Sequence, residues 1–207
     1  MKMNKNVKRY TFIIVLSVIM NFVFYNIAHY FHLPAWLDCI GTSYAAFVLE
    51  PAAGLLVAFV SNFYEAAFIY DSSSLIYYAT SATVAIGVGI CMRKQGEICW
   101  KRLGLMFIVV FVSGAVVSSL ITIWRTGGIP DSAWERHFYE MAMGVTHSHV
   151  LSCFFGTAVL KFVDVAVITV LLPVFYLLTP HSLININNQD IVSWKNPYFE
   201  KKEQDPS

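Results

Sequence analysis

Long apolar segments constrain this chain more than any other feature of its sequence. Crossing a bilayer as a helix takes about 20 predominantly apolar residues, since every backbone polar group must be bonded within the segment. Six apolar segments are separated by more polar ones: residues 10–31, 35–49, 52–69, 75–92, 103–124 and 154–178. The second and third are short for spans, so we expect them to form a tightly packed hairpin. Only 13% of the residues are charged, against about 25% in soluble domains. We therefore predict an all-α membrane protein, a bundle of six transmembrane helices, and exclude a soluble globular domain.

The distribution of Lys and Arg predicts the orientation. Cytoplasmic flanks of membrane helices carry an excess of these residues. They gather in residues 2–9, 93–102 and 195–202, which lie on one side if there are six crossings, whereas the other side holds only Arg125 and Arg136. The first apolar segment is longer than the core of a signal peptide and no small-residue cleavage site follows it, which favours a retained helix. Both termini are thus expected in the cytoplasm.

The remaining organisation is simple. We expect one transmembrane domain, residues 1–180, followed by a polar cytoplasmic tail, residues 181–207. The longest connection, residues 125–151, contains a stretch at 134–143 that fits an interfacial helix. Long ordered connections often have a functional role, so this connection is a candidate lid over a binding site.

Six polar residues lie inside the predicted spans and suggest a binding site. They form three pairs at helical spacing: Asp38 with Thr42, Asn62 with Glu65, and Lys161 with Asp164. A charged group at the centre of a span costs roughly 2.5–3.5 kcal/mol on insertion scales, so such groups usually face the bundle interior or water. All six fall in the predicted outer half or near the midplane. We expect a polar cavity open to the outside.

Each pair also has a structural interpretation, which stays open at this point. Lys161 and Asp164 can neutralise each other as a buried ion pair. Asp38 can be an acid at a helix N-terminus, where acids are favoured. Asn62 can hydrogen-bond a neighbouring helix.

Other motifs carry little chemistry. His147 and His149 form an H-x-H pair, which we interpret as solvated loop histidines rather than a metal site. The cysteines form no C-x-x-C pair and are expected to act as small apolar residues; they are Cys39, Cys91, Cys99 and Cys153. Because no phosphate-binding loop or catalytic motif is found, we predict no catalytic residue, no metal and no cofactor, and a net charge of +1 gives no reason to expect a nucleic-acid partner.

The segment 33–42, LPAWLDCIGT, together with Pro51-Ala52-Ala53-Gly54 and Ser61-Asn62, resembles the substrate-binding S components of energy-coupling factor (ECF) transporters, in particular members without an assigned substrate. The resemblance implies a multi-pass protein of the bacterial cell membrane that captures a vitamin-like molecule outside. A transmembrane coupling subunit and two ATPase subunits would then drive release inside. Asp38, Thr42 and Asn62 match polar motif positions of the family.

The resemblance leaves the docking mode open. Known members dock on the coupling subunit through a face of small residues on their first helix, and Ser17 with Asn21 is the nearest pair here. The predicted pocket holds the acids Asp38, Glu65 and Asp164 against Lys161, so we expect a neutral or cationic ligand. Aromatic residues such as Trp36 can stack on a flat ring. The full set of predicted substrate-binding residues is Trp36, Asp38, Thr42, Asn62, Glu65, Lys161 and Asp164.

The same sequence features are compatible with two other functions. A membrane-embedded sensor or scaffold module without transport activity would use the tail as its signalling end, but the tail is short and contains no recognisable output domain. An intramembrane enzyme would use Lys161, Asp164 or the histidines. No nucleophile stands at a convincing spacing from a base, so an enzyme ranks last.

Overall fold

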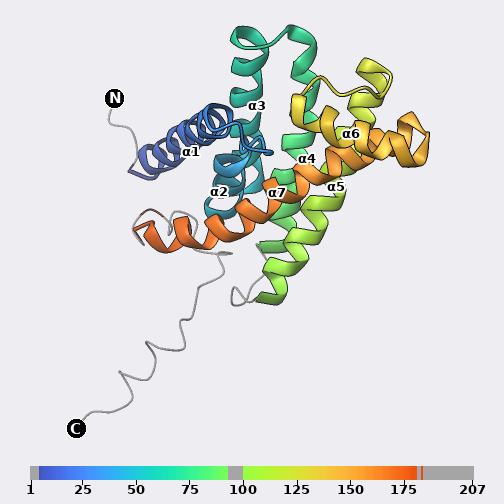
Figure 1. Ribbon diagram of the computed structural model, residues 1–207. Helices are drawn as coiled ribbons and strands as arrows, with labels where there is room; N and C mark the ends of the chain where they lie inside the picture. Colours follow the sequence, from blue (N-terminus) through green and yellow to red (C-terminus); the bar gives the residue numbers. More distant parts are fainter. Residues whose placement is uncertain (1–4, 93–99, 181–182, 184–207) are drawn as a thin grey trace.

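The computed structural model describes residues 5–92, 100–180 and 183, which form a bundle of helices without strands (Figure 1). In chain order the elements are α1 Lys5–Tyr30, α2 Ile40–Val48, α3 Pro51–Phe68, the 3-10 helix η1 Ser72–Tyr77, α4 Tyr78–Met92, α5 Trp100–Thr126, α6 Ala133–Thr146 and α7 His149–Leu178. The predicted all-helical class is confirmed for these residues. The tail 181–207, apart from residue 183, and the basic residues 93–99 lie outside the described part of the chain.

Five segments are long and apolar enough to cross a membrane, as a multi-pass membrane protein requires. They are Val7–Tyr30, Pro51–Phe68, Ser72–Met92, Trp100–Thr126 and His149–Leu178. Many of their apolar side chains are half exposed, for example Ile19, Ile108 and Val170. Exposing such apolar side chains to water costs free energy, whereas contact with lipid chains does not.

The predicted second helix, residues 35–49, differs from the structure. α2 is only nine residues long, which corresponds to about 14 Å of rise, less than half of the roughly 30 Å hydrocarbon core. Residues 31–39 before it are irregular, with positive φ angles at His32 and Leu37. The backbone N–H groups of Trp36 and Leu37 donate to Asp164 Oδ1, at 2.8 and 3.1 Å, instead of to a helical carbonyl. A contact from the far end of the chain therefore replaces the first turns of this helix.

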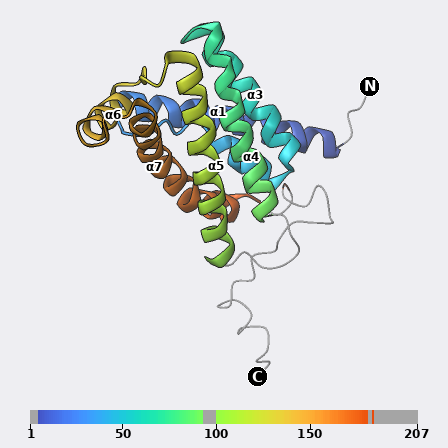
Figure 2. The same ribbon diagram turned by 90° about the vertical axis from the view of Figure 1, so that its right-hand side faces the viewer.

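The helices form two crossing sets around α2. α3, α4 and α5 run side by side (Figure 2), while α1 and α7 cross them obliquely and α2 lies in the middle of the bundle. All nine residues of α2 are buried. The apolar core joins these elements through fully buried side chains such as Ile13, Val57, Val88 and Met106.

A very close approach holds α2 against α1. A methyl group on Gly41 would lie 1.8 Å from the carbonyl oxygen of Ser17, so only glycine fits there. Next to it, Asn21 Oδ1 accepts hydrogen bonds from Gly41 N at 2.7 Å and Thr42 N at 3.2 Å. Asn21 Nδ2 donates to Thr42 Oγ1 and Ser61 Oγ, each at 3.0 Å. One buried amide thus ties α1, α2 and α3 together and satisfies the first backbone N–H groups of α2.

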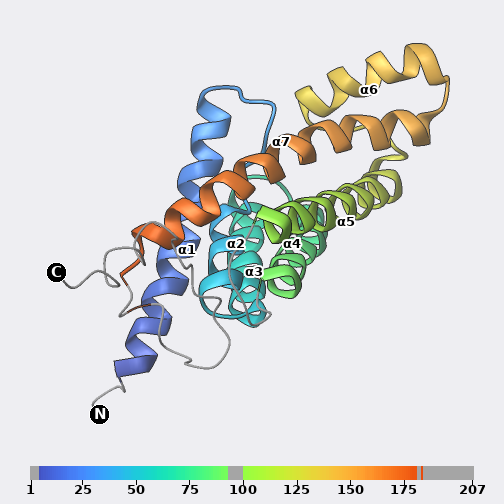
Figure 3. The same cartoon turned by 90° about the horizontal axis from the view of Figure 1, so that it is seen from below.

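The long connection folds back on the bundle. α6 runs alongside the first part of α7 (Figure 3), which confirms a helix over the predicted residues 134–143. Its packing is close, since a methyl group on Gly156 of α7 would lie 2.6 Å from the carbonyl oxygen of Glu135. α6 buries Glu135, Tyr139 and Ala142, and so forms one wall of the site described next.

Candidate functional site: a polar cavity among the helices

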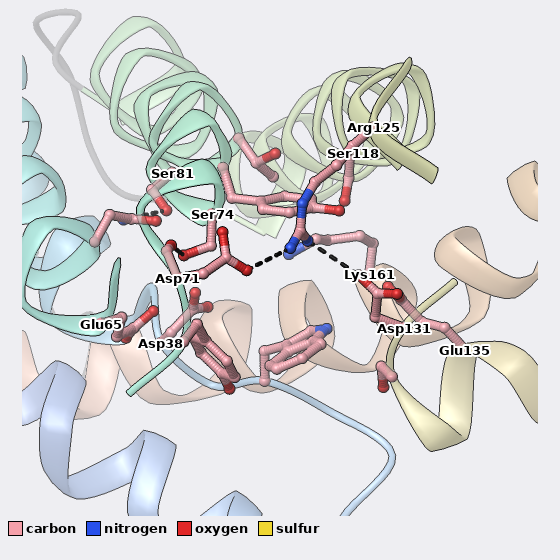
Figure 4. A pocket seen from close by; sticks show the side chains of 16 residues that line it. Asp38, Glu65, Asp71, Ser74, Ser81, Ser118, Arg125, Asp131, Glu135 and Lys161 are labelled. Carbon is pink, nitrogen blue, oxygen red and sulfur yellow. Dashed lines mark hydrogen bonds and ion pairs between the residues drawn. The ribbon is translucent and has the colours of Figure 1, made fainter. Parts of the chain in front are cut away.

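A cavity of about 310 Å³ lies between the 31–39 segment, α3, η1, α4, α5, α6 and α7 (Figure 4). Its volume is at the lower end of the range for small-molecule pockets. Most of the sixteen lining residues are polar or charged. In a helical membrane protein such a hollow is a strong indication of a ligand or ion site.

The structure brings five of the seven predicted site residues to this cavity. They are Trp36, Asp38, Asn62, Glu65 and Lys161. They come from the 31–39 segment, α3 and α7, which are far apart in the sequence. Their role in binding stays a prediction, but their common location agrees with the expectation drawn from polar residues at depth.

The other two predicted residues, Thr42 and Asp164, do not line the cavity. Thr42 is fully buried and bonds to Asn21. Asp164 lies behind the wall and supports it, because its Oδ1 accepts from the backbone of the 31–39 segment. Its Oδ2 lies 3.4 Å from Lys161 Nζ. The ion pair considered from the sequence therefore forms, and Lys161 still reaches the cavity.

Asn62 and Glu65 occupy successive turns of α3 on the cavity side. Asn62 Nδ2 donates to the carbonyl of Ala58 at 2.8 Å and to Ser81 Oγ of α4 at 3.0 Å, so Asn62 also bonds a neighbouring helix. Glu65 as a residue is only 8% exposed. No hydrogen bond or ion pair to its carboxyl group is found among the described residues. Glu65 is therefore buried without a partner.

Asp38 shows a similar lack of partners. Its Oδ1 is buried and has no hydrogen-bond partner in the part of the chain that the structure describes. Figure 4 shows Asp38 and Glu65 on the same side of the cavity. A buried acceptor without a protein partner is rare in native proteins, and a bound water, an ion or a functional role can explain it.

Glu135 of α6 is a lining residue that the sequence analysis missed. It is 7% exposed, and burial raises the pKa of its carboxyl group, while the Lys161 ammonium and a hydrogen bond with Trp36 act in the opposite direction. In the sequence Glu135 stands beside Trp134, Arg136 and His137, a pattern typical of a solvated helix face. Only the packing of α6 on α7 places it inside.

Arg125 organises the rim of the cavity. Its guanidinium forms ion pairs with Asp71 at 2.8 Å and Asp131 at 3.0 Å, and its Nε donates to Ser73 Oγ at 2.9 Å. Hydrogen bonds from the hydroxyl and backbone N–H of Ser73 lower the pKa of Asp71. The cluster links the end of α5, the start of η1 and the loop before α6. From the sequence alone, Arg125 is recognisable only as a positive charge on the predicted outer side.

The described histidines and cysteines are not among the residues that line this cavity. His147 ends α6 with a positive φ of 52°, and His149 Nδ1 shares a hydrogen bond of 2.5 Å with the Tyr139 hydroxyl. Among the described residues, no group of three His, Cys, Asp or Glu side chains is placed to hold a metal ion. The three described cysteines are free and buried, and the fourth, Cys99, falls outside the described ranges.

No family model, curated protein or solved structure matches the chain. The chemistry of the site therefore rests on its own residues. A cavity of this size, with unpaired carboxyl groups and aromatic rings in its wall, is suited to holding a small polar molecule.

Proposed function

We propose that this chain is the substrate-capture membrane subunit of an ECF-type importer, which binds a vitamin or related small metabolite in the cavity. The main support is that Asp38 and Asn62, from the segments that resemble the S components, line one cavity together with Glu65 and Lys161. A helical membrane protein tolerates unpaired acids mainly where water or a ligand meets them.

The same proposal includes six crossings, with both termini in the cytoplasm of a bacterial cell. α2 is too short to cross alone, so the 31–39 segment and α2 together make the second crossing. Irregular backbone is tolerated at such a depth when protein or a water-filled cavity surrounds it. Two contacts support this path: Tyr10 at the start of α1 donates to Glu50 before α3 at 2.6 Å, and the Tyr25 hydroxyl near the other end of α1 bonds Tyr70 after α3.

The proposed partners are a transmembrane coupling subunit and two ATPase subunits. Ser17 and Asn21, the nearest match to the small-residue docking face, are fully buried against α2. Docking through α1 would therefore use its other face, where Phe12, Val15 and Ile19 are about half exposed. Exposed apolar faces suit both lipid and a membrane partner.

Uptake of labelled vitamins tests the proposal. Cells that express the chain with a coupling subunit and ATPases should accumulate at least one vitamin, and Asp38→Ala should reduce this uptake strongly. Glu140→Ala, on the exposed face of α6, is the matched control and should leave uptake unchanged. Uptake unaffected by Asp38→Ala would remove Asp38 from the site. Co-purification with a kinase or regulator instead of ATPases would favour a sensor.

A further inference from the structure

The charges around the cavity are unbalanced. Five carboxyl groups line it, on Asp38, Glu65, Asp71, Asp131 and Glu135, against two cationic side chains, Arg125 and Lys161. Arg125 is already paired with Asp71 and Asp131. Lys161 is paired with Asp164 behind the wall. Within the described residues, the other three lining acids have no ion-pair partner.

Those three acids are Asp38, Glu65 and Glu135, and the carboxyl group of Glu65 has neither an ion pair nor a hydrogen bond among the described residues. The residue is only 8% exposed, and Figure 4 shows it in the cavity wall next to Asp38. Removing a carboxylate from water without a compensating charge or hydrogen bond costs several kcal/mol. No described side chain forms an ion pair or a hydrogen bond with the Glu65 carboxyl group, and Asp38 Oδ1 has no hydrogen-bond partner among the described residues either. A positively charged ligand would satisfy both groups.

We infer that the cavity binds a small organic cation, with its ammonium group placed against Asp38 and Glu65. This inference rests on the proposed function of the same site and narrows the substrate class. An anion would meet three acids while both cationic side chains are engaged elsewhere, so the charge distribution disfavours it.

The geometry favours an organic cation over a bare metal ion. The acids do not converge: Figure 4 shows Glu135 on the side of the cavity opposite Asp38 and Glu65, and no metal-binding group of three is found among the described residues. A cavity of about 310 Å³ has room for a molecular body beside the charged group. The rings of Trp36 and Tyr70 line it too and can attract a cation through their faces.

Matched probes of equal size test the charge preference. The purified full chain is titrated in detergent with phenethylammonium, 2-phenylethanol and phenylacetate, which are cationic, neutral and anionic, and binding is measured by calorimetry and by the shift in melting temperature. The cation should bind at least tenfold more tightly than either of the others. Equal binding of the three probes, stronger binding of the neutral or anionic one, or no binding at all would overturn the inference.

Variants locate the binding and guard against misfolding. Glu65→Gln should weaken phenethylammonium binding about tenfold or more and should remove the preference over 2-phenylethanol. Asp38→Asn is the second variant if Glu65→Gln does not fold, with the same expectation. Glu140→Gln on the exposed face of α6 should bind as the unaltered chain does. A cation preference that survives both cavity variants would contradict the assignment to these acids.

The two proposals can fail separately. Vitamin uptake that tolerates Glu65→Gln, with no preference for cationic probes, would leave the importer standing and remove the cation site. Cation-selective binding that depends on Glu65, in a chain that supports no uptake with any coupling subunit, would keep the cation site and remove the importer.

Discussion

Gly41→Ala tests the close approach of α1 and α2 most directly. The added methyl carbon would lie 1.8 Å from the Ser17 carbonyl oxygen and 3.0 Å from Asn21 Oδ1. An ordinary carbon–oxygen contact is about 3.3 Å or longer. The obstacle is helix backbone, which no side-chain rotation can relieve, so α1 and α2 must separate by about 1.5 Å.

The cost follows from the bonds that this separation breaks. Asn21 Oδ1 accepts from Gly41 N at 2.7 Å and from Thr42 N at 3.2 Å, and a shift of about 1.5 Å takes both beyond hydrogen-bond range. Each buried group left unsatisfied costs about 1–3 kcal/mol, and overpacking adds about 1–3 kcal/mol. The low ends of these ranges already sum to about 3 kcal/mol, so we expect a loss of at least about 3 kcal/mol of stability, or at least about 6 °C in melting temperature for a chain of this size.

The assay is thermal unfolding of the purified protein in one detergent. Gly104→Ala in α5 is the matched control, because a methyl group there has no heavy atom within 4 Å. Alanine is the better helix former by about 1 kcal/mol, so the control should melt at the same temperature as the unaltered chain or slightly higher. Equal melting temperatures for the two variants would refute the close approach.

Three further predictions concern charged residues. Asp164→Asn should lower the free energy of unfolding by about 3–5 kcal/mol, because it leaves the buried Lys161 ammonium without its ion-pair partner. Adding Lys161→Met should restore most of the lost melting temperature in thermal unfolding. Since burial raises the pKa of Glu135, the native state keeps a proton that the unfolded chain releases, and stability falls as pH rises from about 4.3 through the raised pKa. Glu135→Gln should therefore lose less melting temperature between pH 4 and pH 7; an equal loss would show that Glu135 does not titrate in this way. Arg125→Gln should barely change the melting temperature, because Asp71 and Asp131 are more than half exposed, but hydrogen exchange in η1 should accelerate, and unchanged exchange would contradict its linking role.

The helical class and most helix positions follow from the amino-acid sequence. Apolar runs of this length leave few alternatives to a membrane helix, because a bilayer offers no partner for an unbonded backbone group. Because a polar or charged side chain inside a membrane span is also costly, such residues are easy to recognise in the sequence. Asp38, Asn62, Glu65 and Lys161 stand out in the sequence for this reason, and the structure places all four around one cavity.

Contacts between distant segments determine those features of the structure that the local hydropathy pattern predicts wrongly. Residues 35–39 read as helix, yet Asp164 takes up two of their N–H groups across 127 and 128 positions of sequence. Thr42 and Glu135 both differ from expectation: Thr42 is bonded to Asn21 away from the cavity, and the packing of α6 on α7 buries Glu135 in the cavity wall. Hydropathy depends on neighbours along the chain, whereas the partner of a polar group depends on which distant segments meet in the folded bundle.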